Sequence, residues 1–451
     1  MSKATLEKAI STLQAIIIIV VIVVAAAGGG YWYYTSTLPP PGPKEVKIGA
    51  VYPLTGPVTR RVNRDAIDFW IKYLINDAGG IKSLQGAKVR VVWGDCQNKP
   101  DLALQETERL ITMENVVCVL GSWYSSLTYP TQEVCARLKV PNLNWDSSSP
   151  TLLERGYEWY FMNFPHDDWY AKREVDFLVD LLNKKGLMNK VNTIAMFVES
   201  ALFGQTARTS WLKYIDEAKK AGKVNWKLVE DITFAAPVVD VTPEILKLKA
   251  ADADMLFGCP MSPADWVKVV KSMTEQNYFP PIWITMGAGQ TMFDFWNIED
   301  MRKGVKYQFT RFAAGAVMDQ VLKTPKLKGL YEVWMKNFDY FDWGALVTYT
   351  SMLTLKYALE DAGKTDPTYS KNFPTVLRDA LRKVKISKEE AGVYAVKFNE
   401  KTGFNELVEV TIAQCLDDPN KPGDVEWQTI WPWDMASRDP VVPDPRSRGL
   451  K

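Results

Sequence analysis

Two serine-rich segments contain the side chains best suited to hold an anion. In GSWYSSLTYP a predicted strand runs into a helix that begins near Ser126, so the first N–H groups of that helix have no partner within it. The same helix end carries the positive pole of the helix dipole, and Ser125 and Ser126 add hydroxyl donors. The segment predicts a seat for an anion, with simple helix capping as the alternative role of the serines.

The second segment is DSSSP, residues 146–150. Pro150 suits the first helical turn and Ser149 suits an N-cap, so capping accounts for part of the run. Ser147 and Ser148 remain as candidate ligand donors. Asp146 could accept from a ligand cation or could equally close a turn.

Charged and aromatic residues lie near both segments in the chain. Arg60 and Arg61 could form a bidentate clamp on a carboxylate, or could be a solvated loop end. Trp123, Tyr124 and Trp145 flank the serines and could stack on a flat ligand or pack in a core.

The residues needed for catalysis are scarce. His166 is the only histidine, so any Ser-His-Asp or Cys-His mechanism would depend on it, and its turn NFPHDDWY favours a structural or solvated role. The cysteines have no CxxC or zinc spacing, and in an exported protein two or four of them could pair. No catalytic residue, metal or cofactor is expected. The five cysteines are Cys96, Cys118, Cys135, Cys259 and Cys415.

Composition limits the function classes further. A chain of 451 residues is long enough for two domains, and 47% hydrophobic with 24% charged residues is typical of globular proteins. The 54 basic and 53 acidic side chains form no long runs of one sign, so the basic surface that nucleic acid requires is absent.

The serine segments belong to an alternation of strands and helices. Apolar strands such as EVKIGAVY, KVRVVWGD and VVCVLGSW alternate with amphipathic helices, which predicts a doubly wound parallel sheet. After His166 the alternation restarts and predicts a second α/β layer of similar size. Ligands bind at the carboxyl ends of such strands, so a cleft is expected between the two layers.

One segment lies outside this alternation. Leu13–Tyr34 is uncharged and as a helix would reach about 33 Å, enough to cross a hydrocarbon core of about 30 Å. Tyr31–Tyr34 would form an aromatic belt, and Lys3 and Lys8 place the N-terminus in the cytoplasm. With the Pro-rich spacer at 35–44, this predicts a single-pass transmembrane anchor in the cell membrane and an extracellular body; a buried soluble helix is the alternative.

Residues 1–12 contain KAISTL, which resembles the pilin-type signal of archaeal surface proteins; the peptidase would then cut between Ala9 and Ile10. The body resembles the branched-chain-amino-acid-binding type of extracellular solute receptor, a type I periplasmic binding protein. Four segments that carry this resemblance are EVKIGAVYPLTGPV, VLGSWYSSLTYPTQEVCARLKVP, DSSSPTLLERGYEWYF and GALVTYTSMLTLKYALEDAG.

The resemblance covers about residues 45–415 and implies two doubly wound lobes with a hinge, which close on a small molecule and deliver it to an ABC permease and its ATPase subunits. Chain crossings are expected near residues 165, 310 and 392. They would give lobe one as 45–165 with 311–392, lobe two as 166–310 with 393–416, and a C-terminal strap and tail at 417–451.

The resemblance also implies roles for residues of lobe one. Ser125 falls on the serine that holds the ligand carboxylate, Ser148 on a ligand-binding threonine, and Asp146 on a position whose backbone contacts the ligand. With their neighbours and the departures below, the candidate ligand-binding set is Ser125, Ser126, Asp146, Ser147, Ser148, Phe203, Met286, Arg61 and Tyr124.

The chain departs from the family pattern where the ligand ammonium is held. Met286 lies in the loop where amino-acid receptors carry an acidic residue, and Phe203 replaces an aromatic hydroxyl. These changes favour an apolar or anionic ligand such as a carboxylate, an aromatic acid or an amide. An amino acid stays open, because Glu199 and Asp146 could take an ammonium.

The expected function is an extracytoplasmic solute-binding protein of an ABC importer, without a chemical step. The alternative is a ligand-sensing receptor ectodomain of the same fold.

Overall fold

The computed structural model describes residues 3, 11, 14, 16–17, 19–30, 42–56 and 59–450. They belong to two compact units, Met1–Pro43 and Lys44–Lys451. In the first unit, residues 19–30 are helical and their apolar side chains are exposed. No helix among the described residues is both long and apolar enough to cross a membrane. Most of the predicted signal at 1–12 and of the spacer at 35–44, and part of the anchor at 13–34, lie outside the described residues.

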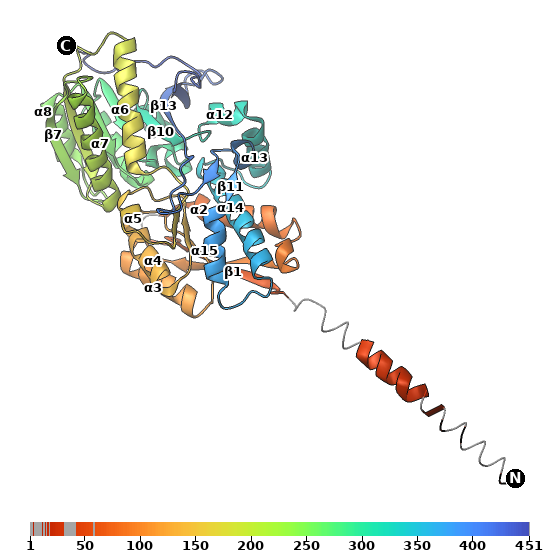
Figure 1. Ribbon diagram of the computed structural model, residues 1–451. Helices are drawn as coiled ribbons and strands as arrows, with labels where there is room; N and C mark the ends of the chain where they lie inside the picture. The colour runs from red at the N-terminus through yellow and green to blue at the C-terminus, as the bar shows by residue number, and fades with distance from the viewer. Residues whose placement is uncertain are drawn as a thin grey trace. The chain divides into compact units, whose positions relative to one another are not determined.

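The second unit, the body, begins with a five-stranded parallel sheet in the order β2-β1-β3-β4-β5 (Figure 1). Strand β1 is buried from Ile48 onward, which explains the apolar run IGAVY, whereas the edge strand β2 is partly exposed. The chain leaves β1 for the edge strand β2 and returns on the other side of β1 as β3, and open α/β sheets bind ligands at such a reversal. The strands are β1 (Glu45–Tyr52), β2 (Lys88–Asp95), β3 (Val119–Gly121), β4 (Asn142–Asn144) and β5 (Tyr160–Met162).

The second sheet has seven strands in the order β14-β13-β10-β9-β8-β6-β7. Strand β13 pairs antiparallel with both β10 and β14, so this sheet is mixed and not purely parallel as predicted. The short connection at 418–424 explains the pairing of β13 with β14, because parallel neighbours need a long crossover. The strands are β6 (Thr193–Glu199), β7 (Lys227–Phe234), β8 (Met255–Cys259), β9 (Ile282–Thr285), β10 (Phe309–Ala313), β13 (Val410–Asp417) and β14 (Val425–Trp431).

Helices cover both sheets. The helices that follow strands of the first sheet are α2 (Arg61–Ile71), α3 (Pro100–Thr112), α4 (Ser125–Leu138) and α5 (Thr151–Glu154), with the short turns η1 (Lys72–Asn76) and η2 (Lys82–Leu84). Two later helices pack beside them, α14 (Gly344–Thr365) and α15 (Phe373–Lys383). Those around the second sheet are α6 (Asp167–Lys184), α7 (Leu202–Lys220), α8 (Thr242–Ala251), α9 (Pro263–Glu275), η3 (Gly289–Thr291), α10 (Phe293–Trp296) and α11 (Glu299–Gly304).

The remaining elements connect the two layers. They are α12 (Met318–Lys323), α13 (Pro325–Met335), α16 (Lys388–Ala391) and a two-stranded ribbon of β11 (Lys385–Ile386) and β12 (Val396–Lys397). The predicted strap at 417–451 contributes β14 to the second sheet. The division into lobes near residues 165, 310 and 392 stays a prediction.

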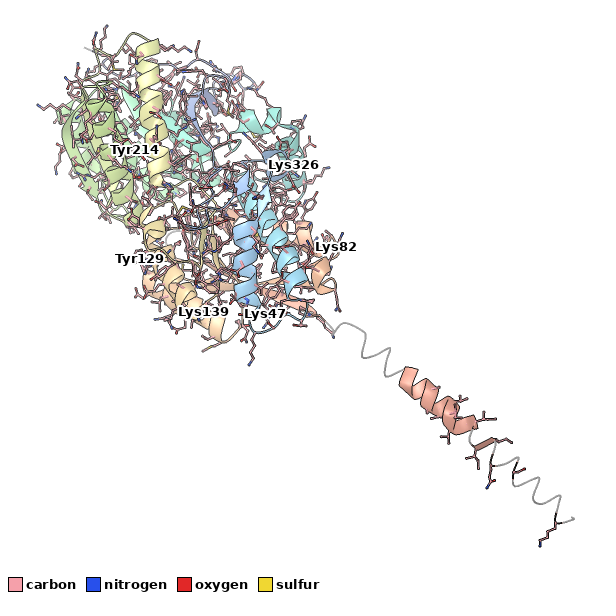
Figure 2. The ribbon with its side chains drawn as sticks, in the orientation of Figure 1. Lys47, Lys82, Tyr129, Lys139, Tyr214 and Lys326 are labelled. Carbon is pink, nitrogen blue, oxygen red and sulfur yellow. The ribbon has the colours of Figure 1, made fainter. Side chains whose placement is uncertain are left out.

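The two layers meet at α4 and α7, which contact each other. Helix α4 follows the carboxyl end of β3, and α7 follows the carboxyl end of β6. Tyr129 on α4 and Tyr214 on α7 lie on the same flank of the body (Figure 2). Because each helix follows the carboxyl end of a strand, its first turn lies at the edge of the sheet where a ligand cleft is expected.

The five cysteines are all buried and free, so the predicted pairing of two or four of them is not found. Cys96 follows β2, Cys118 precedes β3 and Cys135 lies on α4, so these three belong to the first layer.

Candidate functional site

The two predicted serine segments lie side by side at the junction. Tyr124 is the extended N-cap residue of α4, and Ser125, which is 2% exposed, begins the helix. The Ser125 hydroxyl accepts a hydrogen bond from the backbone N–H of Ser149 at 3.2 Å. Ser126 is half-buried in the first turn. The amides of Leu127 and Thr128 are bonded to the carbonyl of Tyr124, so the amides of Ser125 and Ser126 and these hydroxyls give the first layer its donors for an anion.

Ser147 has a structural role within this arrangement. Its hydroxyl lies 2.9 Å from the carbonyl of Ser122, 3.1 Å from that of Trp123 and 2.6 Å from the hydroxyl of Thr128. Asn144 accepts from its backbone N–H at 2.9 Å. These bonds fasten the loop after β4 to the loop after β3, so the hydroxyl of Ser147 is already occupied by the protein itself.

Ser148 lies against the start of α6. It is buried, and its carbonyl accepts from the backbone N–H of Asp167 at 2.7 Å. Burial raises the pKa of Asp167 to about 7, while the hydroxyls of Thr206 and Ser148 act against the rise. His166, just before α6, packs its ring against Phe404 at 4.7 Å, and burial lowers its pKa to about 4.

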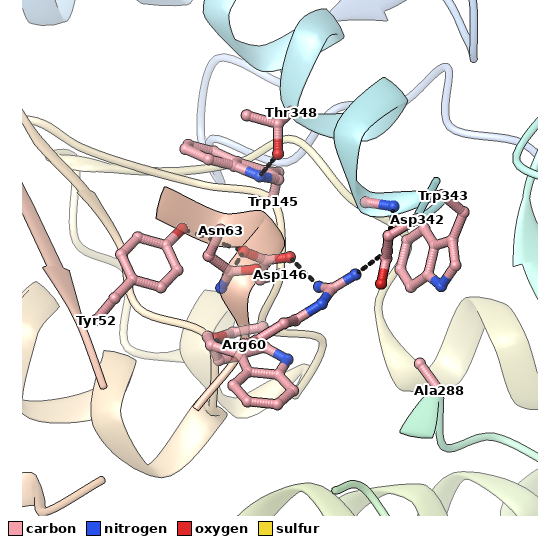
Figure 3. Close-up of polar contacts among 12 residues, drawn as sticks. Tyr52, Arg60, Asn63, Trp145, Asp146, Ala288, Asp342, Trp343 and Thr348 are labelled. Atoms are coloured by element: carbon pink, nitrogen blue, oxygen red, sulfur yellow. Dashed lines mark hydrogen bonds and ion pairs between the residues drawn. The ribbon is translucent and has the colours of Figure 1, made fainter. Parts of the chain in front are cut away.

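A buried ion cluster around Arg60 joins the first layer to the residues before α14 (Figure 3). Arg60 Nη2 lies 2.7 Å from Asp342 Oδ1, and Nη1 lies 3.4 Å from Asp146 Oδ1. Tyr52 donates its hydroxyl to Asp146 Oδ2 at 3.1 Å. The guanidinium carbon also lies 5.0 Å from the ring centre of Trp343, a cation–π distance.

The cluster has one cation and two carboxylates. Burial lowers the pKa of Arg60, but the charges of Asp342 and Asp146 outweigh this and raise it. Burial raises the pKa of Asp146 to about 6, although Arg60 and the Tyr52 hydroxyl act against the rise. The cluster thus contains one more carboxyl group than it has cations. Arg60 is neutralised by the protein and is not free to clamp a ligand carboxylate.

Arg61 has the solvated position that was the alternative to a ligand clamp. Its side chain is 57% exposed and pairs with Asp65 at 3.1 Å, and its guanidinium lies 4.5 Å from the ring of Tyr340. The buried arginine is Arg60. The buried residues of α2 include Asn63, Ala66, Ile67 and Trp70, which are three or four residues apart or adjacent. Arg60 lies three residues before Asn63, so it falls on the same buried side.

The second layer contributes an acidic group to the same junction. Glu199, at the end of β6, is 1% exposed, and its Oε2 accepts from the backbone N–H of Met261 at 3.2 Å. Its Oε1 is buried and has no hydrogen-bond partner in the described part of the chain. Burial raises the pKa of Glu199 to about 8, and the nearby Asp265 adds to the rise. A cation placed beside Oε1 would satisfy this group.

Tyr124 connects the two sides. Burial raises its pKa well above the usual value, the charges of Glu199 and Asp265 raise it further, and the charge of Arg60 lowers it. The Tyr124 side chain thus lies within electrostatic range of lobe-one and lobe-two groups alike. It also packs on Trp123, with ring centres 4.7 Å apart.

The two predicted apolar contacts of lobe two are both buried. Phe203 is 1% exposed in the first turn of α7, and Met286 is 0% exposed after β9. The loop after Met286 is tightly packed, because a Cβ on Gly287 would lie 1.8 Å from the carbonyl oxygen of Pro260. Both side chains can line a closed cleft, and neither can pair with a charge.

Sequence reasoning missed Tyr52, Asn63, Asp342 and Trp343 as members of the site. Asp342 is separated from Arg60 by 282 residues, so no local pattern links them. The one available signal was the helical period of α2, which marks Arg60 and Asn63 as inward-facing polar residues. Around the whole junction, the described residues contain no cluster of metal-binding side chains.

The chain is similar to known proteins in sequence and in fold. Residues 45–406 match a family model described as periplasmic binding protein. Leu/Ile/Val-binding protein homolog 7 of Brucella abortus (strain 2308) is 26% identical over 307 residues, which cover 66% of this chain and 72% of that protein.

Two solved structures share the fold. One is a branched-chain amino acid transporter substrate binding protein from Streptococcus pneumoniae in complex with isoleucine, with a TM-score of 0.66, 17% identity and coverage of 86% of this chain and 100% of that chain. The other is a solute binding protein of an ABC transporter from Rhodopseudomonas palustris BisB5 in complex with 3,4-dihydroxy benzoic acid, with a TM-score of 0.68, 16% identity and coverage of 90% and 100%.

Proposed function

The chain belongs to the periplasmic binding protein family, and we propose that it captures an amino-acid-like zwitterion between its lobes for an ABC importer. The observation that carries the ligand class is the opposite character of the two sides of the junction. Lobe one offers the first-turn amides of α4 with Ser125, which suit a carboxylate. Lobe two offers Glu199 with an unpartnered, buried oxygen in the described part of the chain, which suits an ammonium.

The departures from the family pattern fit this proposal once Glu199 is considered. Met286 cannot hold an ammonium, but Glu199 reaches the junction from strand β6 of the same sheet. The second carboxyl group of the Arg60 cluster adds to the attraction for a cation. An isolated carboxylate ligand would meet the two carboxylates of the Arg60 cluster, Asp146 and Asp342.

The mechanism requires no chemical step. Ligand binds to the donors of lobe one, lobe two closes with Glu199, Phe203 and Met286, and the closed form docks on the permease. Closure excludes water, which strengthens the charged contacts to the ligand.

The experiment is a thermal-unfolding screen of the full chain in a non-ionic detergent, followed by tryptophan fluorescence. Amino acids, dicarboxylates, aromatic acids and amides are compared, because a ligand at about 100 times its Kd stabilises by about 2.7 kcal/mol. Amino acids should raise the unfolding temperature, and Ser125→Ala and Glu199→Gln should each reduce the rise. Glu332→Gln, on α13 and away from the junction, is the matched control and should leave it unchanged.

The outcomes separate the two parts of the proposal. A rise with aromatic acids alone that Glu199→Gln leaves intact would contradict the zwitterion but keep the receptor. No rise with any compound would contradict the receptor as well.

We also infer that the body is held at the outer face of the cell membrane by its N-terminal segment. The support is the uncharged run Leu13–Tyr34, whose described residues 19–30 are helical and expose apolar side chains. Fractionation of cells, with protease added to intact cells, tests this. We expect the chain in the membrane fraction with its body cleaved; a full-length chain in the soluble fraction contradicts it.

A further inference from the structure

A pocket of about 200 Å³ borders the Arg60 cluster, because Asp342 and Trp343 belong to both, whereas Glu199 and the residues of the serine segments do not line it. Its walls come from η3 and α10, the segment after β10, the residues before α14, and β14. None of the predicted ligand-binding residues lines it. A cavity of about 150 Å³ can hold benzene, so this one is large enough for a small organic molecule. Its six aromatic side chains are Phe293, Trp296, Phe312, Phe341, Trp343 and Trp427.

The rings form connected walls. Trp296 and Trp427 have ring centres 5.9 Å apart with planes inclined at 34°. Phe312 meets Trp427 at 5.9 Å and Trp343 at 6.5 Å, both edge to face. These ring contacts hold the side chains in place without reorganisation, although the ring of Trp343 already contacts the guanidinium of Arg60.

One acidic side chain of the pocket has no partner. Glu426 on β14 is half-buried, and its carboxylate makes no hydrogen bond or ion pair with any residue that the structure describes. Burial raises its pKa to about 7, and the charges of Asp418, Asp319 and Asp424 raise it as well. No lysine, arginine or histidine is among the described residues that line the pocket.

The pocket has one further unsatisfied group. The indole N–H of Trp427 is buried and has no hydrogen-bond partner in the described part of the chain. A second carboxylate, Asp342, also lines the pocket, but it is already paired with Arg60. The pocket therefore combines aromatic faces, negative charge and a free donor.

We propose that this pocket is a second binding site, for a small organic cation with an alkylated ammonium group. The methyl groups of such a cation would contact the indole and phenyl faces, and its charge would lie near Glu426. Neutral aromatic ligands would gain the ring contacts but leave the carboxylate unpaired, and anions would be repelled. The proposal does not depend on the ligand of the interlobe junction.

Isothermal titration calorimetry of the full chain in detergent tests the proposal with choline as the probe. The control compound is 3,3-dimethyl-1-butanol, which has the shape of choline without its charge. We expect saturable binding of one choline per chain, and binding of the neutral compound weaker by about fivefold to thirtyfold, the range of a desolvated cation–π and carboxylate contact.

Variants assign the binding to the pocket. Glu426→Gln should weaken the binding of choline about fivefold or more and leave the binding of the neutral compound unchanged. Trp296→Leu, which removes one half-buried wall, should weaken both. Glu332→Gln should weaken neither.

Three results would overturn the proposal: no saturable choline binding, equal binding of choline and its neutral analogue, or binding that Glu199→Gln abolishes and Glu426→Gln does not change. The last would place the cation in the interlobe junction instead. Amino-acid binding there is measured separately, so its failure leaves the choline result interpretable.

Discussion

Arg60 donates from Nη2 to Oδ1 of Asp342 at 2.7 Å, across 282 residues of chain. Oδ1 of Asp342 also accepts a hydrogen bond from the backbone N–H of Gly344 at 2.8 Å. Its other oxygen, Oδ2, accepts one from the backbone N–H of Phe293 at 3.4 Å. Asp342 thus joins α2 of the first layer to α10 beside the second. A single carboxylate therefore bonds to residues of both layers.

Replacing Arg60 by methionine should destabilise the body strongly. Removal of the guanidinium leaves Asp146 and Asp342 buried without their cation, and breaking a buried pair in this way costs about 3–5 kcal/mol. Arg61→Met is the control, because Arg61 is exposed and surface pairs contribute about 0–1 kcal/mol. Urea unfolding of both variants measures the difference. Equal losses would mean that the cluster adds nothing beyond an ordinary surface pair.

Gly344 should not tolerate a side chain. A Cβ at this position would lie 2.3 Å from Arg60 Nη2 and 3.1 Å from Asp342 Oδ1. Gly344→Ala should therefore cost about 1–3 kcal/mol by overpacking. Gly329→Ala, on α13, has nothing within 4 Å of the new Cβ and should be neutral or stabilise by about 0.5–1 kcal/mol. Thermal unfolding ranks the two; if Gly344→Ala proves as stable as Gly329→Ala, the packing described here is wrong.

These two positions also show what sequence could and could not predict. The alternation of strands and helices was sufficient for the α/β fold, because buried parallel strands leave near-continuous apolar runs. The serine segments could also be found from local sequence, because the residues that begin a helix are recognisable. The role of Asp342 could not be predicted from the sequence, because Arg60 is distant in the chain and no local period connects the two residues.

Within the site, side-chain direction decided which predictions the structure supports. Ser147 and Ser148 are neighbours in one run, but only the structure shows that the Ser147 hydroxyl is bonded to the loop of Ser122. The sequence could have indicated that Arg60 and not Arg61 is the buried arginine, because the burial period of α2 extends back to Arg60. The pairing of β14 was hidden by a proline- and aspartate-rich tail that resembles an irregular strap.

Stability should fall with rising pH in part because of Glu199. Its pKa is raised to about 8 in the folded protein, whereas an unfolded glutamate titrates near the ordinary 4.5. The folded state therefore holds a proton that the unfolded state has lost, so this contribution is fully present below about pH 4.5 and is lost as pH rises towards 8. Glu174 and Asp167 act in the same direction.

Glu199→Gln isolates the contribution of this side chain, because Glu174 and Asp167 remain. The unfolding free energy of the variant should decline less steeply between about pH 5 and pH 8 than that of the ligand-free wild type. Urea unfolding at several pH values provides both slopes. Parallel slopes would contradict a protonated Glu199 in the folded protein.

The thiols should react only after unfolding. All five are free and buried, and burial raises the pKa of Cys96 and of Cys118 to about 12. Thiolate is the reactive form, so alkylation of the native protein should be negligible. After treatment with iodoacetamide without reductant, mass spectrometry should show five labels on the protein in urea and none on the native protein. Fewer than five labels in urea would indicate a disulfide.

The account depends most on the pairing of a ligand ammonium with Glu199 and of a ligand carboxylate with Ser125. The decisive measurement is calorimetric titration with the most stabilising amino acid of the screen and two analogues, one without the ammonium and one without the carboxylate. Glu199→Gln should weaken the amino acid about 10-fold to 100-fold, the range of a hydrogen bond to a charged group, and leave the analogue without the ammonium unchanged. If Glu199→Gln weakens both equally, or neither, the zwitterion site described here is contradicted.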